Sequence, residues 1–278
     1  FESFIFNKKL YSTNQHNFEN SCIKSKSKRQ STRYGGHGLH EYKGKFNPQI
    51  VSVLINIFKL KKGDKILDPF CGSGTTLLES SYSGIDASGF DINPLATLIA
   101  NTKLNLQNLR LVEVEKFLSN LQTNFNQYDL SKSHFSNPER STYLKNWFKE
   151  CFLNDFEVLR AIIISEVSDP NIKNFFLCCA SNILREYSLQ EPLDLRIRRR
   201  KSDYPSVKII DKFIAECIEV FKNIEGLKIL QRDKSNCRAI NLDIRKYNSL
   251  IPHNNFSAVI TSPPYATALP YIDTQRFG

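Results

Sequence analysis

A glycine-rich segment in the first third of the chain has the residue types of a ligand-binding loop. The segment reads DPFCGSGTT, from Asp68 to Thr76, and it lies between a short apolar run and a helical pattern. Gly72 and Gly74 let the backbone turn tightly and approach a ligand closely. The start of a helix adds free N–H groups and the positive end of a dipole, which suit a carboxylate.

An acidic residue follows this loop at the spacing expected of a ribose-binding carboxylate. Asp91 ends the strand-like run SGFDIN, 23 residues beyond Asp68. In nucleotide-binding folds, an acid about 20 residues after the glycine loop accepts hydrogen bonds from ribose hydroxyls. The alternative is an ordinary tight turn and an exposed acid. The coincidence of strand, acid, glycine turn and helix favours the ligand site.

A second segment whose residue types could take part in a reaction, TSPPY, lies near the end of the sequence. It runs from Thr261 to Tyr265, directly after the strand-like run FSAVI. Its two prolines fix φ and remove two N–H donors, which leaves carbonyl groups free to accept hydrogen bonds from an amino group. Tyr265 offers a flat face on which a base can stack. Alone, such a string is more often a rigid loop, and it gains weight only beside the glycine loop.

The elements around these segments alternate between strands and helices. The patterns predict strands from Lys65 to Asp68 and up to Asp91, and helices that open after Pro48, from Gly74 to Tyr82, and with Pro94 in the first turn. Strand-like patterns resume late in the chain with RAINLD and FSAVIT. This order predicts an α/β fold with a parallel sheet.

Residues 105–226 interrupt the alternation and have helical patterns. In PSVKIIDKFIAECIEVFKNI, apolar residues recur every three or four positions, which predicts one buried helix face made of Val207, Ile210, Ile214, Cys217 and Phe221. NIKNFFLCCASNILREY predicts another buried helix. The stretch is far longer than an ordinary connection between strands, so we interpret it as an inserted helical subdomain.

Composition favours a globular protein of a reducing compartment. Apolar residues make up 41% of the 278 residues, and no run approaches the length of a membrane span. The seven cysteines form no CxxC pair, which argues against a disulfide framework or a metal site and indicates the cytoplasm. The sequence contains no methionine, so we expect a fragment or a processed product.

Positive charge is concentrated in two places. Residues 1–66 hold 13 Lys/Arg against 4 Asp/Glu, and a second basic run extends from Arg196 to Lys201, in a chain of net charge +10. Such clustering suits a polyanion such as nucleic acid. A solvated tail and a solvated loop are the equally weighted alternative.

Together these segments resemble the S-adenosylmethionine-dependent DNA amino-methyltransferases. DPFCGSGT is similar to the cofactor loop of that family, GFDIN to its ribose-binding strand end, and TSPPY to its catalytic segment in the form usual for cytosine-N4 enzymes. HEYKGKFNP, from His40 to Pro48, resembles the cofactor-contacting element before the loop, although a plain surface loop is equally compatible. Asp243 occupies a place where the family often has an acid near the cofactor adenine.

The resemblance implies a Rossmann-like sheet with helices on both faces, in which the strands before DPF and TSPPY are neighbours. It implies four regions: a basic arm (1–34), the first part of the cofactor domain (35–104), a helical insertion that could recognise the target (105–226) and the rest of the catalytic domain (227–278). Because only 13 residues follow Tyr265, we expect the later strands of that fold to be missing.

The site residues that the resemblance implies fall into two sets. The cofactor set is Lys45, Phe46, Asp68, Pro69, Phe70, Gly72, Gly74, Thr75, Asp91, Asn93 and Asp243. The catalytic set is Ser262, Pro263, Pro264 and Tyr265. The expected activity is methylation of cytosine N4 in double-stranded DNA, without a metal, in a system that would include a restriction endonuclease partner. Adenine N6, an RNA amino group and a non-catalytic nucleic-acid-binding remnant are the alternatives.

Overall fold

The chain forms two compact units in the computed structural model, which describes residues 32–129, 138–192, 194, 198–224, 235–249 and 255–264. The first unit contains the described residues up to Gln107 and those from Lys222 to Pro264. The second extends from Asn108 to Phe221. Each unit is described separately below.

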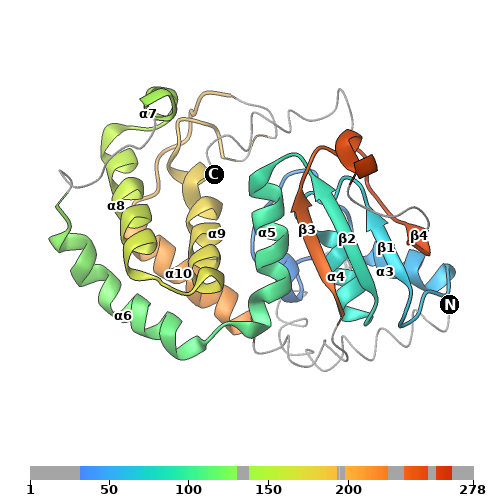
Figure 1. Ribbon diagram of the computed structural model, residues 1–278. Coiled ribbons are helices and arrows are strands. Elements are labelled where there is room, and N and C mark those ends of the chain that lie inside the picture. The colour runs from blue at the N-terminus through green and yellow to red at the C-terminus, as the bar shows by residue number, and fades with distance from the viewer. Residues whose placement is uncertain are drawn as a thin grey trace, which may run out of the picture. The chain divides into compact units, whose positions relative to one another are not determined.

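A four-stranded parallel sheet forms the centre of the first unit (Figure 1). Its strands are β1 (Lys65–Asp68), β2 (Asp86–Asp91), β3 (Cys237–Asn241) and β4 (Ala258–Val259), in the order β3-β2-β1-β4. β1 pairs with β2 on one side and with β4 on the other, so the strand order reverses at β1. The α/β prediction and the predicted adjacency of the DPF and TSPPY strands are therefore confirmed. Ligands bind beyond the carboxyl ends of strands at such a reversal.

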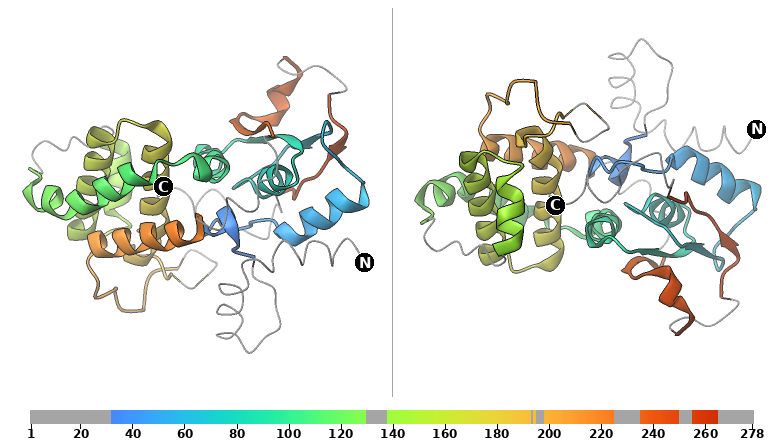
Figure 2. Two further views of the ribbon diagram at one scale, coloured as in Figure 1. Left: turned by 90° about the horizontal axis from the view of Figure 1, so that it is seen from below. Right: turned by 90° about the horizontal axis from the view of Figure 1, so that it is seen from above.

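The helices α3 (Pro48–Ile57), α4 (Thr75–Tyr82) and α5 (Pro94–Asn105) lie on one face of the sheet (Figure 2). The 3₁₀ helix η4 (Ile244–Ser249) lies on the other face. Two short 3₁₀ helices, η1 (Gly35–Gly38) and η2 (Leu106–Asn108), precede α3 and follow α5. The core between helices and sheet is made of aliphatic and small side chains, among them Val51, Ile66, Leu77, Ala100 and Ile260.

An Asn-Pro pair begins two of these helices. The side chains of Asn47 and Asn93 accept hydrogen bonds from the backbone N–H groups two residues later, at 2.9 and 3.0 Å. Pro48 and Pro94 then occupy the first helical position, where a missing N–H costs nothing. These local signals explain why the starts of α3 and α5 could be predicted from the sequence.

The second unit is helical. Its described residues include α6 (Leu111–Gln127), α7 (Pro138–Lys145), α8 (Glu150–Glu166), α9 (Pro170–Tyr187) and α10 (Ile209–Ile224). The last residues of α10, from Lys222, belong to the first unit. The ring of Phe176, on α9, packs against Phe117 of α6 and Phe213 of α10. Its centroid lies 4.4 Å from that of Phe117 and 6.0 Å from that of Phe213. The helical interpretation of this stretch is consistent with these elements.

The predicted apolar face of α10 was wrong at its first position. Val207 lies before the helix, which begins at Ile209, and it is 49% exposed. Its carbonyl accepts a hydrogen bond from the hydroxyl of Tyr187 at 2.9 Å, so the chain bends there instead of continuing the helix. Of the other predicted positions, Ile210 and Cys217 are buried, and Ile214 and Phe221 are half-buried. Ile209, Phe213 and Val220 are also buried.

Neither a membrane-spanning helix nor a metal-binding cluster occurs in the described ranges. No helix there combines the length and the apolar character needed to cross a bilayer. No group of three or more His, Cys, Asp or Glu side chains is placed to hold a metal ion in the same ranges.

Gly74 allows α4 to pack closely against α5. It has a φ of +78°, and a Cβ built on it would lie 2.6 Å from the Cβ of Ala100. Gly74→Ala should therefore lower the free energy of unfolding by about 2–4 kcal/mol, from backbone strain plus overpacking. Urea unfolding followed by circular dichroism measures this loss.

Gly63→Ala is the matched control for this prediction. Gly63 also has a positive φ, of +96°, but a Cβ there would meet no atom within 4 Å. Only the strain of about 1–2 kcal/mol should remain in this variant. Equal losses in the two variants would contradict the packing role of Gly74.

Candidate active site

The glycine loop folds over the carboxyl end of β2. The N–H of Cys71 donates to the carbonyl of Phe90 at 2.9 Å, and the N–H of Gly74 donates to the carbonyl of Cys71 at 2.8 Å. Gly72 and Gly74 have φ values of +49° and +78°, which other residues rarely adopt. The loop thus delivers the chain directly into the first turn of α4.

Asp91 anchors this loop through its carboxylate. One oxygen accepts the N–H of Gly72 at 2.9 Å, and the other accepts the N–H of Asn93 at 2.8 Å. Partial burial raises the pKa of Asp91. Since each carboxylate oxygen has two lone pairs, each can accept a further hydrogen bond, as a ribose hydroxyl would require.

Asp68 joins the loop to the segment that follows β4. Its Oδ1 accepts the hydroxyl of Thr261 at 2.7 Å and the N–H of Phe70 at 3.2 Å. Asp68 is buried, and this burial raises the pKa of its carboxyl group. A second link runs from the hydroxyl of Thr76 to the carbonyl of Ile260 at 3.5 Å. The glycine loop and the TSPP segment after β4 are therefore held together at one edge of the sheet.

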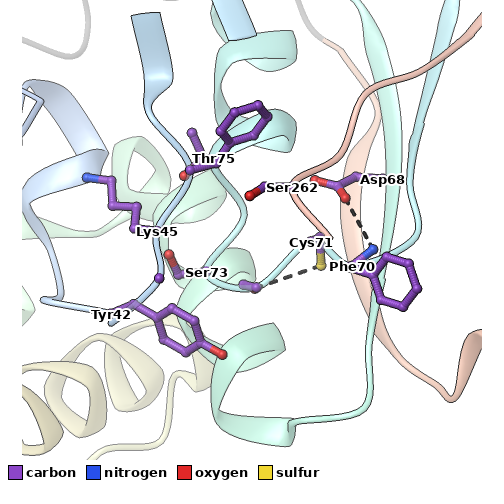
Figure 3. Close-up of a pocket in the computed structure, with 11 residues that line it drawn as sticks. Tyr42, Lys45, Asp68, Phe70, Cys71, Ser73, Thr75 and Ser262 are labelled. Carbon is purple, nitrogen blue, oxygen red and sulfur yellow. Dashed lines mark hydrogen bonds between the residues drawn. The ribbon is translucent and has the colours of Figure 1, made fainter. Parts of the chain in front are cut away.

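A cleft opens at this edge (Figure 3). In Figure 3, Ser262 lies beside Asp68, and Tyr42 and Lys45 come from the segment before α3. The residues that line the cleft are Tyr42, Gly44, Lys45, Phe46, Asp68, Phe70, Cys71, Gly72, Ser73, Thr75 and Ser262. Aromatic rings, hydroxyl groups and exposed backbone are thus combined in one site.

Seven of the predicted site residues line this cleft: Lys45, Phe46, Asp68, Phe70, Gly72, Thr75 and Ser262. The lining does not include Pro69, Gly74, Asp91, Asn93, Asp243, Pro263 or Pro264, and Tyr265 lies outside the described residues. Gly74 and Asn93 have the structural tasks described above, helix packing and helix capping. The side chain of Asp243 pairs with Arg245, which lowers the pKa of Asp243 to about 2.

Lys45 turns its amino group toward the preceding chain and away from Ser262 (Figure 3). Its Nζ donates to the carbonyls of Thr32 and His37, each at 3.0 Å. Burial lowers the pKa of Lys45 to about 8. The part of Lys45 that faces the cleft is therefore its aliphatic stem, and its amine fixes the segment that carries Tyr42 and Phe46.

A buried polar cluster holds the chain that precedes Tyr42 against α4. The carboxylate of Glu79, on α4, accepts hydrogen bonds from Tyr34, at 2.7 Å, and from Ser52, and it contacts Nε2 of His37 at 2.7 Å. Both His37 and Glu79 are buried, and burial lowers the pKa of His37 to about 4. This cluster connects η1, α3 and α4 behind the cleft.

Sequence reasoning missed four lining residues. Cys71 and Ser73 lie inside the glycine segment, but neither was in the predicted cofactor set, although most of their neighbours were. Tyr42 and Gly44 lie in HEYKGKFNP, where an aromatic ring beside a glycine was the available signal. Cys71 packs against Gly89, where an added Cβ would lie 2.6 Å from that of Cys71, and burial raises the pKa of the Cys71 thiol. It is thus a poor nucleophile, in keeping with a packing role.

The sequence also matches a known family over the part that builds this site. Residues 6–102 match the family model described as DNA methylase, which covers the N6 and N4 enzymes. The matched stretch includes β1, the glycine loop, β2 and most of α5. No solved structure matches the chain at a significant level.

Individual relatives divide into long and short matches. The Type II methyltransferase M.MvaI of Kocuria varians is 24% identical over 245 residues, which are 82% of this chain and 53% of the relative. The Type II methyltransferase M.MjaII of Methanocaldococcus jannaschii is 50% identical over 68 residues, 24% of this chain and 13% of the relative.

A tRNA (guanine(10)-N2)-dimethyltransferase of Methanothermobacter thermautotrophicus is 35% identical over 74 residues, 27% of this chain and 21% of the relative. Even in the long match, the chain spans only about half of the relative. M.MvaI, a Type II methyltransferase, thus matches through most of this chain, whereas the tRNA enzyme shares a short segment.

Proposed function

We propose that this chain, a member of the DNA amino-methyltransferase family, carries the cofactor site and the catalytic segment of an enzyme that methylates N4 of cytosine in DNA. One observation carries the proposal: Ser262 of the TSPP segment lines the same cleft as Asp68, Gly72 and Thr75 of the glycine loop. A methyl donor and an acceptor amine must meet in a single site, and this cleft joins the two segments that would bind them.

The chemistry of the cleft fits S-adenosylmethionine, the methyl donor of this family. The first turn of α4 has Gly74 as its N-cap, which supplies no capping side chain, so the helix start can bind a carboxylate. Tyr42, Phe46 and Phe70 provide aromatic surface for an adenine. We propose that Asp91, beside the lining at Gly72, binds the ribose.

The cofactor, when bound, supplies an activated methyl group. The amino nitrogen of cytosine is a poor nucleophile because its lone pair is delocalised into the ring. In our proposal the Ser262 hydroxyl and the Pro263 carbonyl accept its hydrogens, which favours a tetrahedral nitrogen and aligns its lone pair. Tyr265, outside the described residues, would stack on the base after it is flipped from the duplex.

Asp68 would act in this scheme through Thr261. The hydroxyl of Thr261 is committed to Asp68, which fixes the residue immediately before Ser262. A hydrogen bond to a buried carboxylate is stronger than one between neutral groups, so it holds the backbone of the TSPP segment firmly. We therefore assign Asp68 and Thr261 to positioning and Ser262 to the amine.

We propose cytosine and not adenine as the target base because of Ser262. The resemblance associates serine at this position with cytosine-N4 enzymes and Asn or Asp with adenine-N6 enzymes. Methylation of an RNA amino group is the second candidate, and it is favoured only by the short match to the tRNA enzyme. The long match to a Type II methyltransferase favours DNA.

The product and Ser262 are tested together. We expect the protein, incubated with duplex DNA and labelled S-adenosylmethionine, to place the label in N4-methylcytosine after digestion to nucleosides and mass spectrometry. Ser262→Ala should lower turnover about tenfold or more, while cofactor affinity changes less than about twofold, because the lost bond is made to the amine. Label only in N6-methyladenine would overturn the cytosine assignment, and label only in RNA would overturn the substrate class.

Ser257→Ala is the matched control for this experiment. Ser257 lies at the opposite end of β4, where its hydroxyl donates to Asp64 at 2.9 Å. Turnover in this variant should stay within about twofold of the wild type, because the hydroxyl contacts a surface turn. An equal loss in both serine variants would mean that β4 as a whole, and not the Ser262 hydroxyl, determines turnover.

DNA is the proposed polyanionic partner. Two arginines of the basic run from Arg196 to Lys201 make contacts within the protein. Arg199 stacks over Trp147 at 4.9 Å and Arg200 over Tyr204 at 4.5 Å, and Arg200 also donates to the carbonyl of Glu186 at 2.7 Å. Arg198 and Lys201 are exposed. We propose that these two exposed residues contact phosphates. The arm residues before Thr32, and Arg196, lie outside the described ranges.

Removal of these two charges should flatten the salt dependence of DNA binding. Each phosphate contact contributes about 0.9 to the slope of log K against log salt, so Arg198→Gln/Lys201→Gln should reduce its magnitude by about 1.8. The control is Lys116→Gln/Lys222→Gln, which removes two charges from exposed helix positions. Fluorescence anisotropy at several salt concentrations measures both slopes. Equal slopes in the two variants would mean that the basic run is only solvated.

A further inference from the structure

Lys103 is a buried lysine directly behind the cleft. It lies in the last turn of α5 and is 2% exposed. Its Nζ donates to the carbonyl of Ser73 at 3.0 Å and to the hydroxyl of Ser73 at 3.1 Å. Ser73 is itself buried and lines the cleft between Gly72 and Gly74. A long cationic side chain is rarely this buried without a specific task.

Lys103 fixes the peptide unit between Ser73 and Gly74 from one side. The carbonyl of that unit accepts from Lys103, and its N–H donates to the carbonyl of Cys71 at 2.8 Å on the other side. With both polar groups of the unit engaged, the turn between the two positive-φ glycines has a single orientation. The direction in which α4 presents its first N–H groups depends on that turn.

Lys103 also determines what the Ser73 hydroxyl can do. A serine hydroxyl has one hydrogen to donate and two lone pairs. Because the amine donates to Oγ, the hydroxyl is used there as an acceptor, and its own hydrogen remains available to donate. Since Ser73 lines the cleft, that hydrogen can be given to an anionic ligand group.

The charge of Lys103 acts at the same end of α4. Burial lowers the pKa of His37 and of His40, and the nearby charge of Lys103 lowers the pKa of both imidazoles further. The positive end of the α4 dipole begins one residue after Ser73. The lysine charge, the helix start and the serine hydroxyl therefore all favour a negative group at one place in the cleft.

We propose that Lys103 is a positioning residue for the carboxylate of the methionine part of S-adenosylmethionine. It holds Ser73 so that the hydroxyl and the start of α4 face that carboxylate, and it adds a buried positive charge behind them. The inference rests on the proposed function, because it requires the cofactor to bind in this cleft.

Two ligands that differ in this carboxylate provide the test. S-adenosylhomocysteine has the amino-acid carboxylate, and 5′-methylthioadenosine lacks the whole amino-acid end. We expect Lys103→Met to bind S-adenosylhomocysteine about ten- to a hundredfold more weakly than the wild type, and 5′-methylthioadenosine within about twofold. Isothermal titration calorimetry measures both affinities without a methylation assay.

Two further variants keep the test decisive. Ser73→Ala should lose S-adenosylhomocysteine affinity selectively, by a smaller factor, and it carries the test if Lys103→Met does not fold. Lys116→Met, which removes an exposed charge from α6, should bind both ligands as the wild type does.

Each outcome is distinct. Selective loss of S-adenosylhomocysteine in the Lys103 and Ser73 variants supports the role. Equal loss of both ligands, or no loss, overturns it and leaves the proposed function intact. A wild-type protein that binds neither ligand overturns the proposed function itself.

Discussion

The buried carboxylate of Asp68 is the contact on which the site depends. It connects the end of β1 to Thr261, which lies 193 residues later in the sequence and directly after β4. Parallel pairing of Ile66 with Ala258 and of Leu67 with Val259 places these two strand ends at the same edge of the sheet. Without this pairing, the glycine loop and the TSPP segment would have no common cleft.

A second carboxylate, that of Asp91, also holds the glycine loop, from the neighbouring strand β2. Asp91 ends β2 and holds the glycine loop through the N–H of Gly72. Burial raises the pKa of both acids, and both are stabilised as carboxylates by hydrogen bonds from neighbouring groups. The loop is thus fixed by Asp68 where it leaves β1, by Asp91 at Gly72 and by Lys103 at Ser73. A loop held at three points is preorganised, which reduces the entropy lost when a ligand binds.

Much of this arrangement could be predicted from local sequence signals. The bounds of β1 were predicted from a short apolar run, and the starts of α3 and α5 from Pro48 and Pro94. Such signals act through the chain nearby. Val207 was misplaced because the hydrogen bond that bends the chain there comes from Tyr187, on another helix. The spacing of apolar residues cannot report such a distant partner.

The supporting contacts behind the cleft could not be predicted for the same reason. Lys103 lies in NPLATLIANTKL, where a lysine near a helix end is ordinarily a solvated residue, and only the tertiary structure brings it to Ser73. Glu79 and His37 are 42 residues apart, and neither belongs to a pattern that indicates pairing. The adjacency of β1 and β4 came from the family resemblance, because strand order is not encoded in the local pattern of either strand.

In our proposal the cofactor and the target amine share the cleft between the glycine loop and Ser262. A crystal structure of the protein with S-adenosylhomocysteine would show where the ligand binds. We expect the ligand to lie in this cleft, with its carboxylate at Ser73 and the start of α4, its ribose hydroxyls on Asp91 and its sulfur facing Ser262. A ligand bound at another surface, or bound here with its sulfur turned away from Ser262, would overturn the proposed shared site.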